Sequence, residues 1–181
     1  MQPLHWRGGG ESASICICAN GRPRVGTIDM GGKREIESFE AQIGRAFEQV
    51  IPFNRVLGLK IDSLDPKAPR LRFDMRPELV GNPVRQILHG GVISATLDVV
   101  GGLAIALASL AEKADAMTIQ NFPNIGTIDL RVDYLRPGRG KYFIATGRVV
   151  RLGGRVAVVH MELVNDTDEQ IATGSAAYIV G

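Results

Sequence analysis

The feature that most constrains this chain is a long apolar run that begins at Gly90-Gly91 and continues to about Leu110 without a proline. The run is too long for a typical strand, so it predicts a helix. Apolar side chains recur on every side of that helix, and such a helix is expected to be buried on every side. One carboxylate, Asp98, lies two turns after the paired glycines. Because an unpaired buried charge is costly, a group of this kind is usually partnered or functional.

The start of this helix and Asp98 together suggest acyl-transfer chemistry. The free backbone N–H groups at Gly90-Gly91 and the positive end of the helix dipole attract negative charge. A carbonyl under attack gains such charge, and the loss of one backbone donor to it costs roughly 3 kcal/mol in known cases. The alternative is that Asp98 only caps or bridges within the core. The functional interpretation is favoured because no cationic residue lies nearby in the helix.

The same apolar run is long enough to span a bilayer, but Asp98, the glycine pairs and the absence of flanking Lys or Arg argue against a membrane segment. The chain has 181 residues, of which 45% are hydrophobic and 22% charged, as in one soluble domain. A formal net charge of +2 gives no indication of a basic surface that binds nucleic acid. The three histidines are far apart in the sequence, so a metal site is not expected. No charged segment followed by an apolar one opens the chain, so we expect a cytoplasmic protein.

Hydrophobic periodicity predicts the other elements. Residues 1–33 are repeatedly broken by glycine and are predicted to be a flexible N-terminal arm, with one domain over residues 34–181. A helix is expected from about Glu35 to Ile51, ended by Pro52. The segment Ala111 to Gly126 is expected to hold a short helix or a lid. Strands are predicted at Val56–Ile61, Leu71–Met75, Ile128–Tyr134, Tyr142–Leu152, Arg155–Val164 and Ile171–Val180.

This order of elements predicts an α+β fold. A lone apolar helix has to be covered, and the economical cover is one antiparallel sheet of about five or six strands wrapped round it, with an additional N-terminal helix. The last four strands are expected to form a meander. Strands and helices do not alternate along the chain, so a doubly wound fold is not expected.

Several motifs in this order resemble the hotdog fold and, most closely, the PaaI-like acyl-CoA thioesterases. The matching stretches cover about residues 50–181. They are Asn82-Pro83, Leu88-His89-Gly90-Gly91, Asp98 nine positions after His89, Gly126–Gly138 and Gly153-Gly154-Arg155.

The resemblance implies hydrolysis of a small-to-medium acyl- or aryl-CoA. Gly91, with Gly90 beside it, would be the oxyanion donor, and Asp98 would be the nucleophile or the general base. Asn82 would help to place the water or the carbonyl, and Thr127 would complete the site. His89 is a possible base, although we favour a role in which it only shapes the turn and bonds to backbone.

The resemblance also implies a homodimer or homotetramer with the site between subunits, so that Asp98 faces the partner subunit's Gly91. Arg151 and Arg155 would meet the phosphates of CoA, which is part of the substrate, and no metal or cofactor is implied. Two alternatives stay open at this point. One is a hotdog enoyl-CoA hydratase or dehydratase, and the other is a protein that binds acyl-CoA without hydrolysing it.

Overall fold

The computed structural model describes residues 15–17, 23–25, 39–112 and 124–181. The chain divides into two units, residues 1–36 and residues 37–181. In the first unit, β1 (Ile15–Ile17) and β2 (Pro23–Val25) pair antiparallel. The rest of the predicted arm over residues 1–33, and most of the predicted lid segment, lie outside the described residues.

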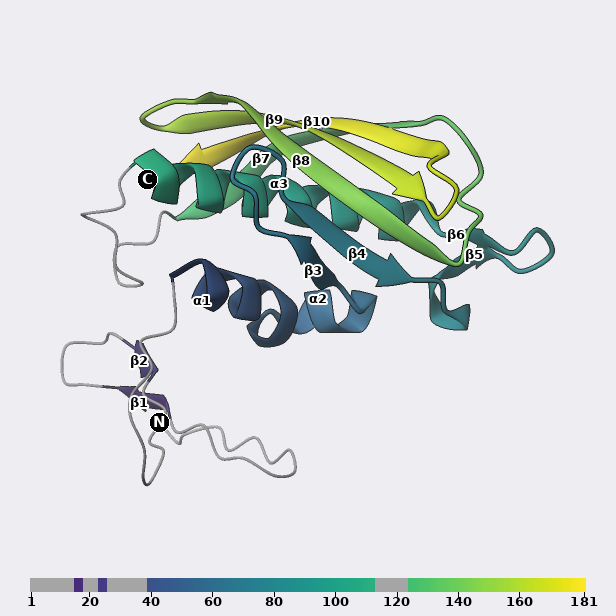
Figure 1. Ribbon diagram of the computed structural model, residues 1–181, viewed down its shortest axis with the longest axis horizontal. Helices are drawn as coiled ribbons and strands as arrows, with labels where there is room; N and C mark the ends of the chain where they lie inside the picture. The colour runs from purple at the N-terminus through teal and green to yellow at the C-terminus, as the bar shows by residue number, and fades with distance from the viewer. Residues whose placement is uncertain (1–14, 18–22, 26–38, 113–123) are drawn as a thin grey trace. The chain divides into compact units, whose positions relative to one another are not determined.

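The second unit is built on one antiparallel sheet of six strands and the long helix α3 (Gly90–Glu112), which lies across one face of the sheet (Figure 1). The predicted α+β arrangement of five or six strands round a central helix is therefore confirmed. In spatial order the strands are β3 (Lys60–Ser63), β4 (Arg70–Asp74), β8 (Tyr142–Leu152), β9 (Val156–Asn165), β10 (Gln170–Val180) and β7 (Ile125–Tyr134).

The predicted meander of four strands is wrong for its first strand, β7, which does not lie beside β8. Strands β8, β9 and β10 follow one another in the sheet, but β7 pairs with β10 and forms the far edge. The segment after β7 passes the start of β10, where the N–H groups of Leu135 and Arg136 both donate to the carbonyl of Ile171. This seven-residue loop, 135–141, is long enough to cross to β8, whereas a meander would need only a tight turn.

Helix α3 is enclosed in its second half and open in its first. The segment Leu103–Leu107 has no exposed surface. Gly147 of β8 allows close approach because it has no side chain: a Cβ there would lie 3.1 Å from Cβ of Ala104, in this segment, and 2.7 Å from the carbonyl oxygen of Val100, just before it. The prediction that α3 is buried on every side is wrong for its first half, where Ala95, Asp98 and Gly102 form a half-buried face.

The predicted N-terminal helix is confirmed in part and is divided. It consists of α1 (Phe39–Arg45) and a π-helical turn, η1 (Ala46–Val50); the proposed start at Glu35 lies outside the described residues. Pro52 does not simply end this helix. It opens a further helix, α2 (Pro52–Leu57), because proline is well suited to the first helical position.

The strand predicted at Val56–Ile61 is wrong in its first half, because the helix that Pro52 opens includes Val56 and Leu57. Helix α2 continues to Leu57 and ends at Gly58, which adopts a left-handed conformation with φ 73°. Glycine favours this conformation at the end of a helix because it has no Cβ. Strand β3 therefore begins only at Lys60.

The segment 77–88 is more ordered than the predicted loop. It contains a short 3-10 turn, η2 (Pro77–Leu79), and the small hairpin of β5 (Val80–Asn82) and β6 (Ile87–Leu88), which leads directly into α3. In this way the hairpin fixes the point at which α3 begins.

The enclosed half of α3 should carry much of the stability of the fold. We predict that Leu103→Ala, at a fully buried position, lowers the free energy of unfolding by about 2–5 kcal/mol because it leaves a cavity. Val84→Ala, at a position that is 92% exposed, should change it by less than about 0.5 kcal/mol. Urea unfolding followed by circular dichroism measures both, and equal effects would show that α3 is not the core of the fold.

Candidate functional site

Asp98 is held by two hydroxyl groups from the sheet. The Oγ1 of Thr127, on β7, donates to Oδ1 of Asp98 at 2.8 Å. The hydroxyl of Tyr178, on β10, lies 3.1 Å from the same Oδ1 and 2.9 Å from the backbone oxygen of Asp98. The carboxylate is half-buried, so these bonds replace part of the water that it loses.

Both hydroxyls reach Asp98 because of an irregularity in strand pairing. Tyr178 pairs with Thr127, whereas the preceding residue, Ala177, pairs with Asp129, so that Ile128 is left as an extra residue on β7. A bulge of this kind changes the face to which side chains point. Strict alternation would place Ile128 with Leu130 on the core side; instead Ile128 is 59% exposed and Thr127 turns to the helix.

Tyr178 was not predicted as a site residue. Its side chain is buried, and this burial, together with the adjacent Asp98 carboxylate, raises the pKa of Tyr178 far above its usual range. The group therefore stays protonated and remains a donor at neutral pH. A tyrosine at an inward position of the last strand was visible in the sequence, but its partner 80 residues away was not.

Gly101 makes room for this tyrosine. A Cβ at Gly101 would collide with the Tyr178 hydroxyl and would lie 2.9 Å from the ring carbon that bears it. The hydroxyl can therefore reach Asp98 only because position 101 has no side chain.

The start of α3 is braced from three directions. The N–H of His89 donates to the carbonyl of Leu79 at 2.8 Å, and the N–H of Leu88 donates to the carbonyl of Gly138 at 3.0 Å. The hydroxyl of Tyr134 donates to the carbonyl of Gly90 at 3.2 Å. Residues of the 77–88 segment, β7 and the loop 135–141 thus all fix the backbone at this point.

His89 makes a local bond to the backbone of this bend. Its Nδ1 accepts the N–H of Gly91 at 2.8 Å, which is the type of contact expected of a histidine that shapes the turn. The donor that the sequence assigns to an oxyanion is therefore bonded to His89 in this structure. Both residues are exposed, so another acceptor can approach the same N–H.

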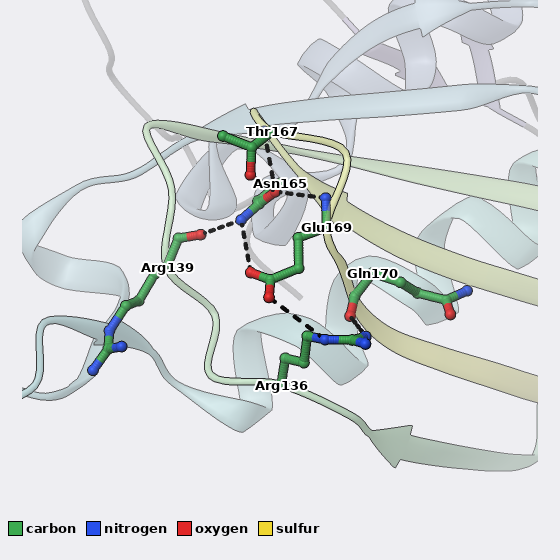
Figure 2. Close-up of polar contacts among 6 residues, drawn as sticks. All are labelled: Arg136, Arg139, Asn165, Thr167, Glu169 and Gln170. Atoms are coloured by element: carbon green, nitrogen blue, oxygen red, sulfur yellow. Dashed lines mark hydrogen bonds and ion pairs between the residues drawn. The ribbon is translucent and has the colours of Figure 1, made fainter.

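A buried asparagine holds the loop that carries Gly138 (Figure 2). The side-chain amide of Asn165 donates to the carbonyl of Arg139 at 2.8 Å, and its oxygen accepts the N–H of Glu169 at 2.9 Å. Arg136 donates to the carbonyl of Gln170 at 2.9 Å and lies 3.5 Å from the carboxylate of Glu169. These contacts join the loop 135–141 to the β9–β10 turn.

A cavity of about 800 Å³ opens beside Asp98. Asp98, Thr127 and Tyr178 contribute polar atoms to one part of its wall, and most of the remaining lining is apolar. The apolar part comes from α1, η1, α2, α3 and the start of β7, with the side chains or backbone of Ile43, Ala46, Phe47, Ile51, Phe53, Val99, Gly102 and Ile125.

Thr127 is the only predicted site residue that is hydrogen-bonded to Asp98 within one chain, whereas His89 and Gly91 are bonded to each other at the bend before the helix. Gly91 precedes Asp98 by seven residues on the same helix, which separates them by about 10 Å along its axis. Asn82 lies in the hairpin before α3, where its Oδ1 accepts the N–H groups of Val84 and Arg85 at 3.1 Å and 3.0 Å.

Arg151 and Arg155 lie at the β8–β9 hairpin and are exposed. The carbonyl of Arg155 accepts the N–H of Val180 at 2.9 Å, so this hairpin is adjacent to the end of β10 that carries Tyr178. Within the described residues, no group of three or more His, Cys, Asp or Glu side chains is arranged to hold a metal ion.

Comparisons with known proteins agree on one family. The profile of the Thioesterase superfamily matches residues 85–172. The medium/long-chain acyl-CoA thioesterase YigI of Salmonella typhimurium is 43% identical over 142 residues, which cover 77% of this chain and 92% of that protein. The protein of the same name from Escherichia coli strain K12 is 42% identical over the same shares. A Shewanella oneidensis protein described as related to the thioesterase superfamily has a crystal structure that matches with a TM-score of 0.73, at 46% identity, over 78% of this chain and 94% of that one.

Substitution by alanine should change the stability of the fold in opposite directions at the neighbouring glycines Gly101 and Gly102. We predict that Gly101→Ala lowers the free energy of unfolding by about 1–3 kcal/mol, because the new methyl group overlaps Tyr178. Gly102→Ala should raise it by up to about 1 kcal/mol, because a Cβ there meets no atom within 4 Å and alanine favours a helix.

Tyr178→Phe separates the collision from other causes. Since this change removes the atom that the new methyl group would strike, the cost of Gly101→Ala should be smaller in the Tyr178→Phe background. Chemical denaturation of the four proteins measures the coupling. Strictly additive effects would contradict the proposed contact.

Proposed function

Because this chain belongs to the thioesterase superfamily and is an acyl-CoA thioester hydrolase, we propose that Asp98 carries the reaction and that the adjoining cavity receives the acyl chain. The hotdog fold predicted from the sequence is confirmed by the match to the Shewanella oneidensis structure. The observation that supports the assignment of the site is one carboxylate, bonded to two hydroxyls, at the wall of a mostly apolar cavity.

The role of Asp98 follows from its charge and its surroundings. A carboxylate acts as a nucleophile or a general base only in its ionised form. Hydrogen bonds from Thr127 and Tyr178 hold the carboxylate of Asp98 in one orientation. Both donors bond to Oδ1, and neither bonds to Oδ2, which the proposal makes the reactive oxygen.

Two routes are compatible with this arrangement. In one, Oδ2 attacks the thioester carbon, the CoA thiolate leaves, and water then hydrolyses the mixed anhydride. In the other, Oδ2 takes a proton from a water molecule, which attacks the same carbon and expels the thiolate. Both routes place negative charge on the thioester oxygen, and both therefore need a donor to that oxygen.

In the proposal, that donor comes from a second chain. A nucleophile approaches a carbonyl carbon to about 3–3.5 Å, and an oxyanion donor lies about 3 Å from the oxygen. Gly91 of the same chain is displaced by about 10 Å along α3 from Asp98, while the carboxylate is directed sideways to the sheet. The proposal therefore uses the partner subunit's Gly91, with Gly90 beside it. The thioester oxygen would replace Nδ1 of His89 as the acceptor of that N–H.

The surface of the chain supports a second copy. Strand β7 forms one edge of the sheet, and such an edge is a template for pairing with another chain. Large apolar side chains are exposed along it and on the segment from η1 to α2 that lines the cavity. On β7 they are Ile128 and Tyr134, and on the η1–α2 segment they are Val50, Ile51, Phe53 and Val56. A homodimer would cover the open half of α3, and a homotetramer would be two such dimers.

The remaining predicted residues are assigned to the substrate. The proposal assigns the CoA phosphates to the exposed Arg151 and Arg155, because guanidinium groups suit phosphate geometry. Asn82 orders the hairpin that precedes the bend of its own chain and, in the proposal, helps to place the water or the carbonyl. No cofactor is needed in either route, since CoA itself is part of the substrate.

The apolar cavity favours substrates with an extended acyl chain. The two YigI relatives are described as medium/long-chain acyl-CoA thioesterases, and the cavity of about 800 Å³ has room for a chain of this kind. The proposal also places the protein in the cytoplasm. Helix α3 is long and apolar enough to cross a membrane, but 61% of its apolar stretch is buried inside the fold.

The assignment of Asp98 is tested by Asp98→Asn, which keeps the size of the side chain and removes the charge. We predict that kcat for acyl-CoA hydrolysis falls by about 10²–10⁴-fold, as expected for loss of an acid–base group. Asp129→Asn is the matched control, because it removes an exposed carboxylate from the same strand as Thr127. Release of CoA is followed with a thiol reagent. Equal turnover by the wild type and Asp98→Asn would exclude Asp98, and tight binding without any release by the wild type would favour the acyl-CoA-binding alternative.

The shared site is tested by mixing two inactive variants. Gly91→Pro removes the backbone donor at a position in the first turn, where proline is tolerated. In a mixed dimer with Asp98→Asn, one of the two sites has both an intact Asp98 and an intact Gly91. We predict that co-expression restores about one quarter of the wild-type activity, since random pairing gives half mixed dimers with one working site each. No restoration, with both variants folded and dimeric, would place the site within one chain.

A further inference from the structure

Two adjacent glycines in α3 have opposite surroundings. At Gly101 a side chain would strike Tyr178, so the glycine is required by packing. At Gly102 a Cβ would meet no atom within 4 Å, so nothing in the packing of the described chain requires a glycine there. A glycine inside a helix costs about 1 kcal/mol relative to alanine. The absence of a side chain at position 102 therefore needs another explanation.

The position of Gly102 relative to Asp98 supplies one. The two residues are four apart in α3, so they share a helix face and are separated by about 6 Å along the axis. Both line the cavity, as does Val99 between them. Ile43 and Phe47 of the α1–η1 segment also line the cavity. A bare backbone at position 102 thus leaves open the part of the cavity that continues past the reactive carboxylate.

We propose that Gly102 determines the length of acyl chain that the enzyme accepts. This inference rests on the proposed function, because it takes the acyl chain to run from the thioester at Asp98 along α3. About five carbon–carbon bonds of about 1.5 Å, in a zigzag, bring an acyl chain to the level of Gly102. Shorter chains end before this position. Longer chains pass over the glycine into the space bounded by Phe47 and Ile43.

The proposal makes a side chain at position 102 a block that only long substrates meet. We expect Gly102→Leu to lower kcat/KM for palmitoyl-CoA by about 10-fold or more, because even one methylene group changes discrimination in an apolar pocket by that factor. Butyryl-CoA should change by less than about 2-fold, and octanoyl-CoA should fall between the two. Gly102→Ala, which adds only a methyl group, should give a smaller change in the same order.

Ala111→Leu is the matched control, since it adds the same bulk at an exposed position near the end of the same helix, outside the cavity lining. It should leave the ratio of palmitoyl-CoA to butyryl-CoA turnover as in the wild type. Circular dichroism and the free energy of unfolding establish that each variant is folded; if Gly102→Leu does not fold, Gly102→Ala decides the question.

The outcomes separate this inference from the proposed function. Wild-type protein that hydrolyses none of the three thioesters would overturn the proposed function itself. An active wild type, with Gly102 variants that keep its length profile or lose all three substrates equally, would overturn the role of Gly102 alone. A selective loss of the longer substrates, absent from Ala111→Leu, supports it.

Discussion

The structure of the site depends on keeping one carboxylate in place on a helix that is otherwise almost entirely apolar. Asp98 has no cation beside it on α3, and its half-buried position removes part of its hydration. Thr127 and Tyr178 supply hydroxyl donors from two strands that are paired with each other. The orientation of the carboxylate therefore depends on the register in which these two strands pair. The bulge at Ile128 provides the required register, because it brings Thr127 to the helix side of the sheet.

In our proposal, helix α3 combines a structural half and a functional half. From Leu103 to Leu107 it is enclosed, and small residues of the sheet such as Gly147 allow the closest approach. Its first half is only partly covered, and Asp98, with the cavity beside it, lies there. A helix enclosed along its whole length would be more stable, but it would leave no wall on which a substrate could bind. In our proposal a second copy of the chain covers this half.

The bend at the start of α3 is positioned by parts of the chain that take no part in the chemistry. Asn165 joins the β9–β10 turn to the loop 135–141, and the carbonyl of Gly138 in that loop accepts the N–H of Leu88, just before the bend (Figure 2). Since a displaced oxyanion donor loses most of its effect, this bracing is part of the preorganisation that the proposed reaction needs. The loop passes this point because it crosses from β7, at the edge of the sheet, to β8 (Figure 1).

The sequence by itself determined the central helix, most of the strands and the helix-in-sheet arrangement, because hydrophobic periodicity and glycine or proline at segment ends are local signals. Asp98 stood out for the same reason, as a single charge in an apolar run. The tertiary structure alone decided that β7 lies beside β10 and that Thr127 rather than Ile128 faces α3. It also revealed Tyr178 as the second partner of Asp98 and assigned different surroundings to Gly101 and Gly102. These features depend on contacts between residues far apart in the chain, and on one extra residue in a strand, which no local pattern encodes.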